Sequence, residues 1–173
     1  RQNFCPNSFR IPFLLLKLQG ENTCLLQNMS ARNPQLILLS PAKLSPSIQK
    51  WAEQMGDIIR KSGGNVDIVN WAGEDPGDIA LQKDFMIILI TAELMAELGK
   101  EPGKIKWFEK RLKSRKLHKD QILRLVLSGR SELQAFSGTF GSLSALPMES
   151  LLEPVDAVEI ILKELNQRIR ILG

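Results

Sequence analysis

The chain has 173 residues, of which 43% are hydrophobic and 24% are charged. This composition is typical of a globular domain and excludes a collagen-like, low-complexity or highly charged disordered chain, and no apolar run approaches the roughly 18 residues of a helical membrane span. The net charge of +4 permits an acidic protein partner, a phosphoinositide surface or nucleic acid without requiring any of them.

The first 34 residues differ from the rest in their pattern of apolar and turn-forming residues. Residues 9–18 form a strand-like apolar run, residues 19–22 (QGEN) are typical of a turn, and residues 23–27 can return as a second strand. We therefore expect residues 1–34 to form a β-rich, hairpin-like extension and linker ahead of an α/β domain in residues 35–173. Because the chain begins with arginine rather than methionine, we also expect it to be a piece of a longer protein.

Both cysteines, Cys5 and Cys24, lie in this extension. They can form one disulfide or remain as two thiols, and the sequence leaves both alternatives open. The spacing lacks a C-x₂-C pair, and the one histidine, His118, lies in a lysine-rich stretch where we expect it to face solvent. The sequence therefore predicts no metal site.

From residue 35 the pattern alternates between strands and helices. Continuous apolar runs of strand length indicate strands buried on both faces. The predicted strands are 35–39, 65–71, 85–90 and 121–127, with a short fifth edge strand at 140–146. The predicted helices run from Pro46 to the Gly63-Gly64 pair, from 92 to 98 before Gly99, through the basic segment around 105–112, and from Pro154 onward.

Strands separated by helices imply right-handed crossovers and helices on both faces of a parallel sheet. We expect a doubly wound α/β fold with a mostly parallel five-stranded sheet in the order 2-1-3-4-5, as in flavodoxin-like and TIR-like domains. In such a fold, ligands and partners meet the loops at the carboxyl ends of the strands. Those loops are where functional residues are expected.

The loop after the first strand, residues 40–45 (SPAKLS), precedes a helix N-terminus. Its hydroxyls and the helix could hold a phosphate, as in a flavodoxin-like cofactor binder. The loop has no glycine, however, and Ser45 followed by Pro46 is the usual pattern of a helix N-cap. We favour the structural N-cap, and no cofactor is predicted. The chain also lacks the G-x-G-x-x-G, Walker A and G-x-S-x-G patterns.

The loop after the second strand carries acidic residues and a Pro-Gly turn in residues 71–79 (WAGEDPGDI). This segment resembles the loop after the second strand of Toll/interleukin-receptor (TIR) domains and of the related SEFIR domains. In that family the loop typically reads Arg-Asp, two further residues, Pro-Gly and then an apolar position. Here Glu74-Asp75 is followed at once by Pro76-Gly77 and then Ile79, so the motif is shorter and lacks the arginine. The predicted partner-binding residues of this loop are Glu74, Asp75, Pro76, Gly77, Asp78 and Ile79.

The resemblance extends over residues 35–173. Residues 85–91 (FMIILIT) match the family's buried third strand followed by a small hydroxyl residue, and Trp107-Phe108-Glu109 is similar to the tryptophan-led motif of the next helix. Between Ile79 and Phe85 there is room for about one helical turn, where TIR domains have a full helix. The resemblance implies a cytosolic signalling domain, in a receptor or an adaptor, that assembles with similar domains.

Some TIR domains cleave nicotinamide dinucleotides with a glutamate of that helix, and Glu109 is the nearest candidate for such a catalytic residue. Its offset from Trp107 is two residues rather than the family's three. We favour a surface carboxylate that pairs with Lys113 at i+4. Binding without turnover is therefore the leading interpretation, and a nucleotide-cleaving enzyme is the alternative.

A second candidate partner-binding segment is the basic helix. Ile105, Phe108 and Leu112 recur at helical spacing, so one face can dock on the sheet while the other projects cations into water. The predicted partner-binding cations are Lys106, Lys110, Arg111, Lys113, Arg115 and Lys116. These cations could engage the acidic loop of another copy, a phospholipid surface or nucleic acid. Nucleic acid, in an RNA-binding accessory domain, is the alternative with least support, because no exposed aromatic residues are interleaved with the charges.

Overall fold

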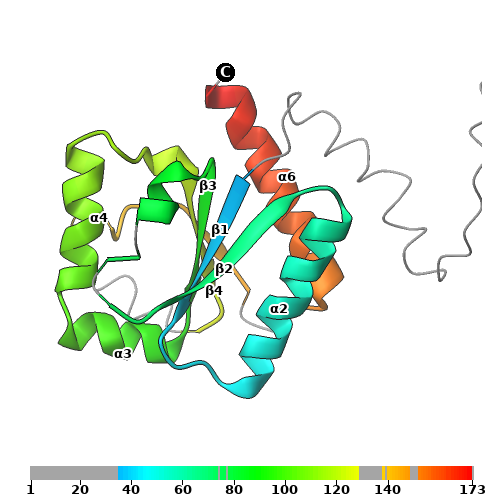
Figure 1. Ribbon diagram of the computed structural model, residues 1–173, viewed down its shortest axis with the longest axis horizontal. Coiled ribbons are helices and arrows are strands. Elements are labelled where there is room, and N and C mark those ends of the chain that lie inside the picture. Colours follow the sequence, from blue (N-terminus) through cyan, green and yellow to red (C-terminus); the bar gives the residue numbers. More distant parts are fainter. Residues whose placement is uncertain are drawn as a thin grey trace, which may run out of the picture.

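The computed structural model describes residues 35–73, 75–76, 78–128, 138, 140–148 and 152–172. The predicted hairpin-like extension, with Cys5 and Cys24, lies outside the described residues. One parallel sheet forms the centre of the domain, with the strand order β2-β1-β3-β4-β5 (Figure 1). The predicted fold class and strand order are confirmed. The strands are β1 (Gln35–Pro41), β2 (Asn65–Trp71), β3 (Phe85–Ile90), β4 (Ile122–Val126) and β5 (Ala145–Pro147).

The central strands are buried on both faces. Successive side chains of a strand point to opposite faces, so Leu36 and Leu38 pack into one hydrophobic core while Ile37 and Leu39 pack into the other. All six residues of β3 are buried in the same way. This two-sided burial explains why these strands appear in the sequence as continuous apolar runs.

Helices cover the two faces in pairs. On one face lie α2 (Pro46–Lys61) and α6 (Pro154–Leu172), which contact each other, and on the other lie α3 (Ala92–Lys100) and α4 (Gly103–Lys113) (Figure 1). Two short 3₁₀ helices complete the described structure, η1 (Asp78–Gln82) and η2 (Lys119–Gln121). The layers therefore place β2, α3 and α4 next to one another at the carboxyl edge of the sheet.

The residues predicted to begin and to end α2 do so in the structure. The Ser45 hydroxyl accepts a hydrogen bond from the backbone N–H of Ile48 at 3.4 Å, and Pro46 occupies the first turn. At the other end, Gly63 has φ +90°, and the N–H of Gly64 donates to the carbonyl of Ile59. This left-handed residue lets the chain reverse and enter β2.

Several predicted boundaries differ from the structure: β1 continues beyond residue 39 to Pro41, and β4 spans Ile122–Val126 rather than 121–127. The third strand leads through the buried N-cap Thr91 into α3, which continues past Gly99 to Lys100, because Glu101 at the C-cap still donates its N–H to the carbonyl of Glu97. The fifth strand, β5, begins at Ala145 rather than at residue 140 and ends at Pro147. The stretch before β3 contains the short 3₁₀ helix η1 and no α-helix, which agrees with the prediction of about one helical turn between Ile79 and Phe85.

A buried arginine explains the late start of β5. The guanidinium of Arg124, on β4, donates hydrogen bonds to the carbonyl oxygens of Phe140 (2.9 Å), Gly141 (3.3 Å) and Leu143. These carbonyls converge on one side chain and cannot extend along the edge of β4. Burial lowers the pKa of Arg124 from the usual range of arginine to about 10, so the group remains a cation at neutral pH.

None of the helices among the described residues is long and apolar enough to cross a membrane.

Candidate partner-binding surface

Aromatic side chains seat α4 on the sheet. The ring of Phe108 is fully buried and makes edge-on contacts with Trp71 and Trp107, at centroid distances of 5.3 and 5.0 Å, and a tilted contact with Phe140 at 5.6 Å. Such ring pairs add to the free energy gained from burial. The predicted inward positions Ile105 and Leu112 are only half-buried and lie at the margin of this core.

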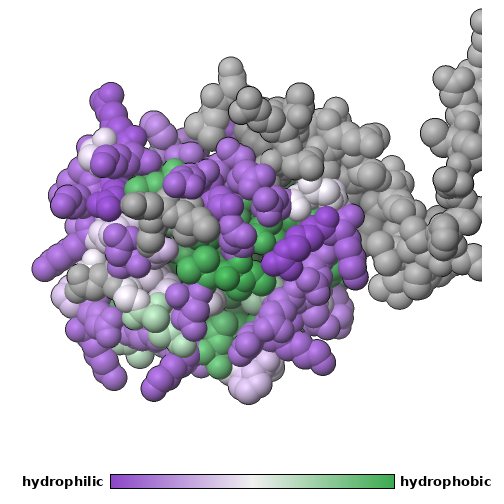
Figure 2. All heavy atoms as spheres, in the orientation of Figure 1, coloured by the Kyte–Doolittle hydropathy of each residue, from purple (hydrophilic) through white to green (hydrophobic). Residues whose placement is uncertain are grey.

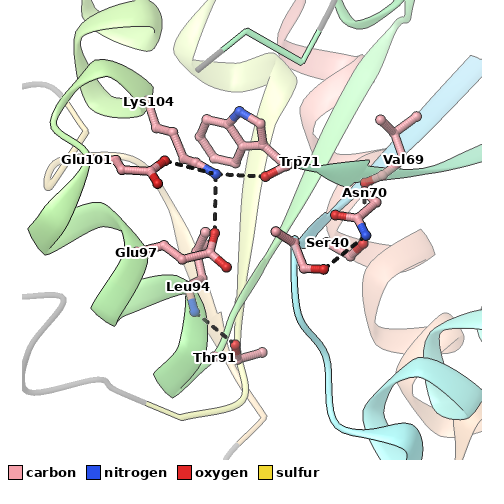
Figure 3. Close-up of polar contacts among 10 residues, drawn as sticks. Ser40, Val69, Asn70, Trp71, Thr91, Leu94, Glu97, Glu101 and Lys104 are labelled. Atoms are coloured by element: carbon pink, nitrogen blue, oxygen red, sulfur yellow. Dashed lines mark hydrogen bonds and ion pairs between the residues drawn. The ribbon is translucent and has the colours of Figure 1, made fainter. Parts of the chain in front are cut away.

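A buried lysine fixes the start of α4. Lys104 is 1% exposed, and its Nζ atom donates to the carbonyl oxygen of Trp71 at 2.7 Å and to the Glu97 carboxylate at 3.2 Å. The Glu101 carboxylate lies at 3.8 Å, and the ammonium is 5.2 Å from the centroid of the Trp71 ring. Figure 3 shows the Lys104 side chain reaching from α4 toward the two carboxylates and the end of β2. One side chain thus joins α3, α4 and β2.

Lys104 lies in the same basic segment as the predicted partner-binding cations, and its structural role was not predicted from the sequence. A signal was present in the spacing. Lys104 precedes Trp107 by three residues and Phe108 by four, so helical periodicity places it on the inward face. A cation on an apolar face needs a partner, and Glu97 and Glu101 supply it.

The remaining cations of α4 and its exit face outward. Lys106, Lys110, Lys113, Arg115 and Lys116 are exposed, and Arg111 is half-buried. Figure 2 shows hydrophilic side chains projecting from the side of the molecule where α4 lies. The structure therefore presents the predicted basic residues to solvent on one side of the molecule. We call these six residues the α4 basic face.

The acidic loop is described only in part. Asp75 is exposed and Pro76 is buried. Asp78 and Ile79 begin η1, but their side chains lie outside the described structure, as do Glu74 and Gly77 entirely. The described part of the loop lies beside α4 of the same chain.

The loop and the helix form a shallow groove of about 500 Å³. The Oδ2 atom of Asp75 is 3.9 Å from the Nη2 atom of Arg111, and the Arg111 guanidinium lies 5.1 Å from the centre of the Trp107 ring. We call this hollow the α4 groove. Its lining residues are Asp75, Pro102, Gly103, Lys106, Trp107, Lys110 and Arg111. The structure thus brings five of the predicted partner-binding positions close together, four of them in the groove and Pro76 next to Asp75 in the chain.

Glu109 lies on a different side of α4. It is half-buried, and its Oε1 atom lies against Gly138, where an added Cβ would come within 2.8 Å. Among the described residues, no ion pair joins Glu109 to Lys113, so the predicted i+4 pair is not formed. The carboxylate points to the segment between β4 and β5, away from the α4 groove.

The residues 40–45 serve the fold. The Ser40 hydroxyl donates to the carbonyl of Val69 at 3.3 Å (Figure 3), and the Asn70 side-chain amide donates to the carbonyl of Ala42 at 3.1 Å. Glu53 also lines a hollow of about 190 Å³ beside this loop. Its carboxylate would repel a phosphate there, because both groups are negatively charged. The structural N-cap interpretation of Ser45 is confirmed.

Within the described residues, His118 and the acidic residues form no group of three or more that could hold a metal ion. His118 is exposed, as predicted.

Comparison with known proteins gives no relative. The chain matches no family model, no curated protein and no solved structure.

Proposed function

We propose that residues 35–173 form a protein-interaction domain that binds an acidic partner through the α4 basic face and the adjoining loop after β2. The observation that carries this proposal is the pairing of Arg111 with Asp75 beside exposed Lys106 and Lys110. Two segments that are 27 residues apart at their nearest described lining positions, Asp75 and Pro102, share one groove at the carboxyl edge of the sheet. In doubly wound domains this edge is where partners and ligands bind.

The charge distribution supports a binding role. Within α4 and its exit, the exposed cations greatly outnumber the acids, so the face attracts anionic groups and speeds encounter with an acidic partner. Like charges at i and i+4, such as Lys106 and Lys110, destabilise an isolated helix. The buried contacts of Lys104 and Phe108 offset that cost and hold the face in one orientation.

The rigid seating of α4 also favours recognition. Partner surfaces that need little ordering on association retain more of their interaction free energy. The face is held at its start by Lys104 and at its end by two backbone hydrogen bonds, from Lys116 to Arg111 and from Arg115 to Leu112. A fixed spacing of cations suits a partner with a complementary spacing of carboxylates.

The resemblance to TIR and SEFIR domains supplies the proposed setting. In that setting the chain acts in the cytosol as part of a receptor or an adaptor, and its partner carries a similar domain or is a second copy. No membrane span, cofactor or turnover is part of the proposal. The partner is defined here by its acidic surface.

Proximity labelling in cells tests the proposal. A biotin ligase is fused to the chain, and the wild type is compared with a Lys106→Glu/Lys110→Glu variant. The matched control is Lys50→Glu/Lys61→Glu, which makes the same charge change at exposed positions of α2, on the opposite layer. We expect a set of proteins that the wild type and the control both label and the α4 variant does not.

The proposal is wrong if the α4 variant and the wild type label the same proteins to the same extent. Sedimentation of the purified chain then separates the two kinds of assembly. If a second copy is the partner, the sedimentation coefficient rises with concentration in the wild type and in the α2 control, but not in the α4 variant. If the partner is a different protein, the coefficient stays constant while the labelling difference persists.

A further inference from the structure

We infer that the α4 groove receives carboxylate side chains from an extended acidic segment of the partner, and that Asp75 is an internal counterion that the partner displaces. This inference rests on the proposed function, because it specifies how the α4 basic face recognises its partner. It adds the chemical class of the ligand, the residues that bind it and a competitor within the chain.

The groove carries more positive than negative charge. Three of its lining residues are cations, Lys106, Lys110 and Arg111, and one is an acid, Asp75. The other lining residues, Pro102, Gly103 and Trp107, bring no charge. A single internal carboxylate therefore leaves an excess of positive charge that an acidic ligand can neutralise.

The internal pair is easily replaced. The closest charged atoms of Asp75 and Arg111 are 3.9 Å apart, and the Asp75 side chain is 53% exposed. A pair whose carboxylate is this exposed contributes little at that separation, since water screens it. A partner carboxylate that excludes water from the groove and forms a shorter bond to the guanidinium would interact more strongly.

Arg111 is prepared for such a bond. Its guanidinium lies over the Trp107 ring at 5.1 Å, and its side chain is only 19% exposed, so the group needs little ordering when a ligand arrives. The Nε of Arg111 and the Nε1 of Trp107 are buried and have no acceptor within the described part of the chain. Buried donors without acceptors raise the free energy of the unbound groove.

The spacing of the cations favours a peptide. Lys106 and Lys110 are one helical turn apart, which places their Cβ atoms roughly 5–6 Å from each other on one side of the helix. In an extended segment, alternate side chains project to the same side about 7 Å apart. Glutamates at alternate positions can therefore meet both lysines, while long side chains absorb the difference.

Nucleic acid fits the groove less well. Proteins that bind single strands combine cations with exposed aromatic rings on which bases stack. The groove's ring, Trp107, is 8% exposed and already carries Arg111 on one side. The groove therefore offers charge without a stacking platform.

Fluorescence anisotropy with a synthetic peptide tests the inference. The probe is a fluorescein-labelled peptide in which three glutamates alternate with glycines. The control peptide carries glutamine in place of each glutamate. The purified chain is titrated into each peptide as wild type, Lys106→Gln/Lys110→Gln, Asp75→Asn, and the α2 control Lys50→Gln/Lys61→Gln.

We expect the glutamate peptide to bind and the glutamine peptide not to bind. The double α4 substitution should weaken binding by about fivefold or more, because it removes two charge contacts. Asp75→Asn should strengthen binding by about twofold to fivefold, because the internal competitor is gone while the side chain keeps its size. The α2 control should bind like the wild type.

The inference is overturned if the glutamine peptide binds equally well, or if Asp75→Asn binds the glutamate peptide no more tightly than the wild type. A weaker complex with Asp75→Asn would show that Asp75 positions Arg111 for the ligand rather than competing with it, and would also overturn the inference. Failure here is distinguishable from failure of the proposed function. If the α4 variant still loses labelled proteins in cells, the binding surface stands and only the carboxylate mechanism is rejected.

Discussion

The Nζ atom of Lys104 donates a 2.7 Å hydrogen bond to the carbonyl oxygen of Trp71, which joins the second residue of α4 to the last residue of β2. The same ammonium contacts Glu97 of α3. The α4 basic face therefore owes its position to a cation that is itself hidden from solvent. The nearby Lys106, two residues further on, is exposed and available to a partner.

Replacing Lys104 with methionine should lower the free energy of unfolding by about 2 kcal/mol. The substitution leaves the Trp71 carbonyl without this donor and the mostly buried Glu97 carboxylate without its cation. Urea denaturation measures the change. The matched control, Lys106→Met, alters an exposed lysine of the same helix and should change stability by less than about 0.5 kcal/mol. Equal effects of the two substitutions would contradict the structural role of Lys104.

Replacing Arg124 with leucine should cost about 3 kcal/mol of stability, because the carbonyls of Phe140, Gly141 and Leu143 lose a shared donor. Arg124→Lys should cost less, since an ammonium still donates but cannot match the planar guanidinium. Chemical denaturation of the wild type and the two variants measures their free energies of unfolding, which should fall in the order wild type, Arg124→Lys, Arg124→Leu. A leucine variant as stable as the wild type would show that these contacts are unimportant.

The stability difference between wild type and Arg124→Leu should not depend on pH between about pH 6 and about pH 9. Burial lowers the pKa of Arg124 to about 10 in the folded chain, below its value in the unfolded chain, so the folded state releases this proton before the unfolded state does as the pH rises. The arginine's ionisation therefore adds stability with rising pH only from about 10 upward, and the slope is zero below it. Denaturation of both proteins at several pH values checks this. A difference that changes by more than about 1 kcal/mol in the neutral range would contradict it.

Two helix ends offer a paired test of backbone conformation. Arg115 after α4 has φ 55°, and Gly63 after α2 has φ 90°. Arg115→Gly should raise the free energy of unfolding by about 0.5–1 kcal/mol, because glycine adopts the left-handed region without steric cost. Gly63→Ala should lower it by about 1 kcal/mol for the same reason. Thermal melts report both shifts, and shifts of the same sign would contradict the argument.

The fold was predictable because its signals are local and repeated. Continuous apolar runs such as β3, helical spacing in α2 and the N-cap at Ser45 each specify an element, and their alternation specifies the parallel sheet. The position of β5 was not predictable in the same way. It depends on how the buried Arg124 collects three carbonyls from residues 140–143, and a sequence pattern does not reveal which carbonyls a side chain reaches.

The candidate site was predictable only in its parts. The acidic loop and the basic helix stand out in the sequence, but their proximity depends on how α4 packs against the end of β2. The sequence suggested that the loop of one copy meets the helix of another, whereas the structure pairs Asp75 with Arg111 in the same chain. The burial of Lys104 was not predicted because a lysine-rich segment indicates a solvated face, although its spacing from Trp107 and Phe108 places it on the inward face of α4. The TIR and SEFIR assignment stays a prediction.

Lysine footprinting of the isolated complex tests the central claim most directly. Proteins that the proximity experiment identifies are purified with the chain, exposed lysines are acetylated briefly, and mass spectrometry compares the bound and free chain. We predict that Lys106 and Lys110 are protected in the complex while Lys50 and Lys61 on α2 react as in the free chain. Unchanged reactivity of Lys106 and Lys110, with protection of the α2 lysines instead, would contradict the claim that α4 is the partner-binding surface.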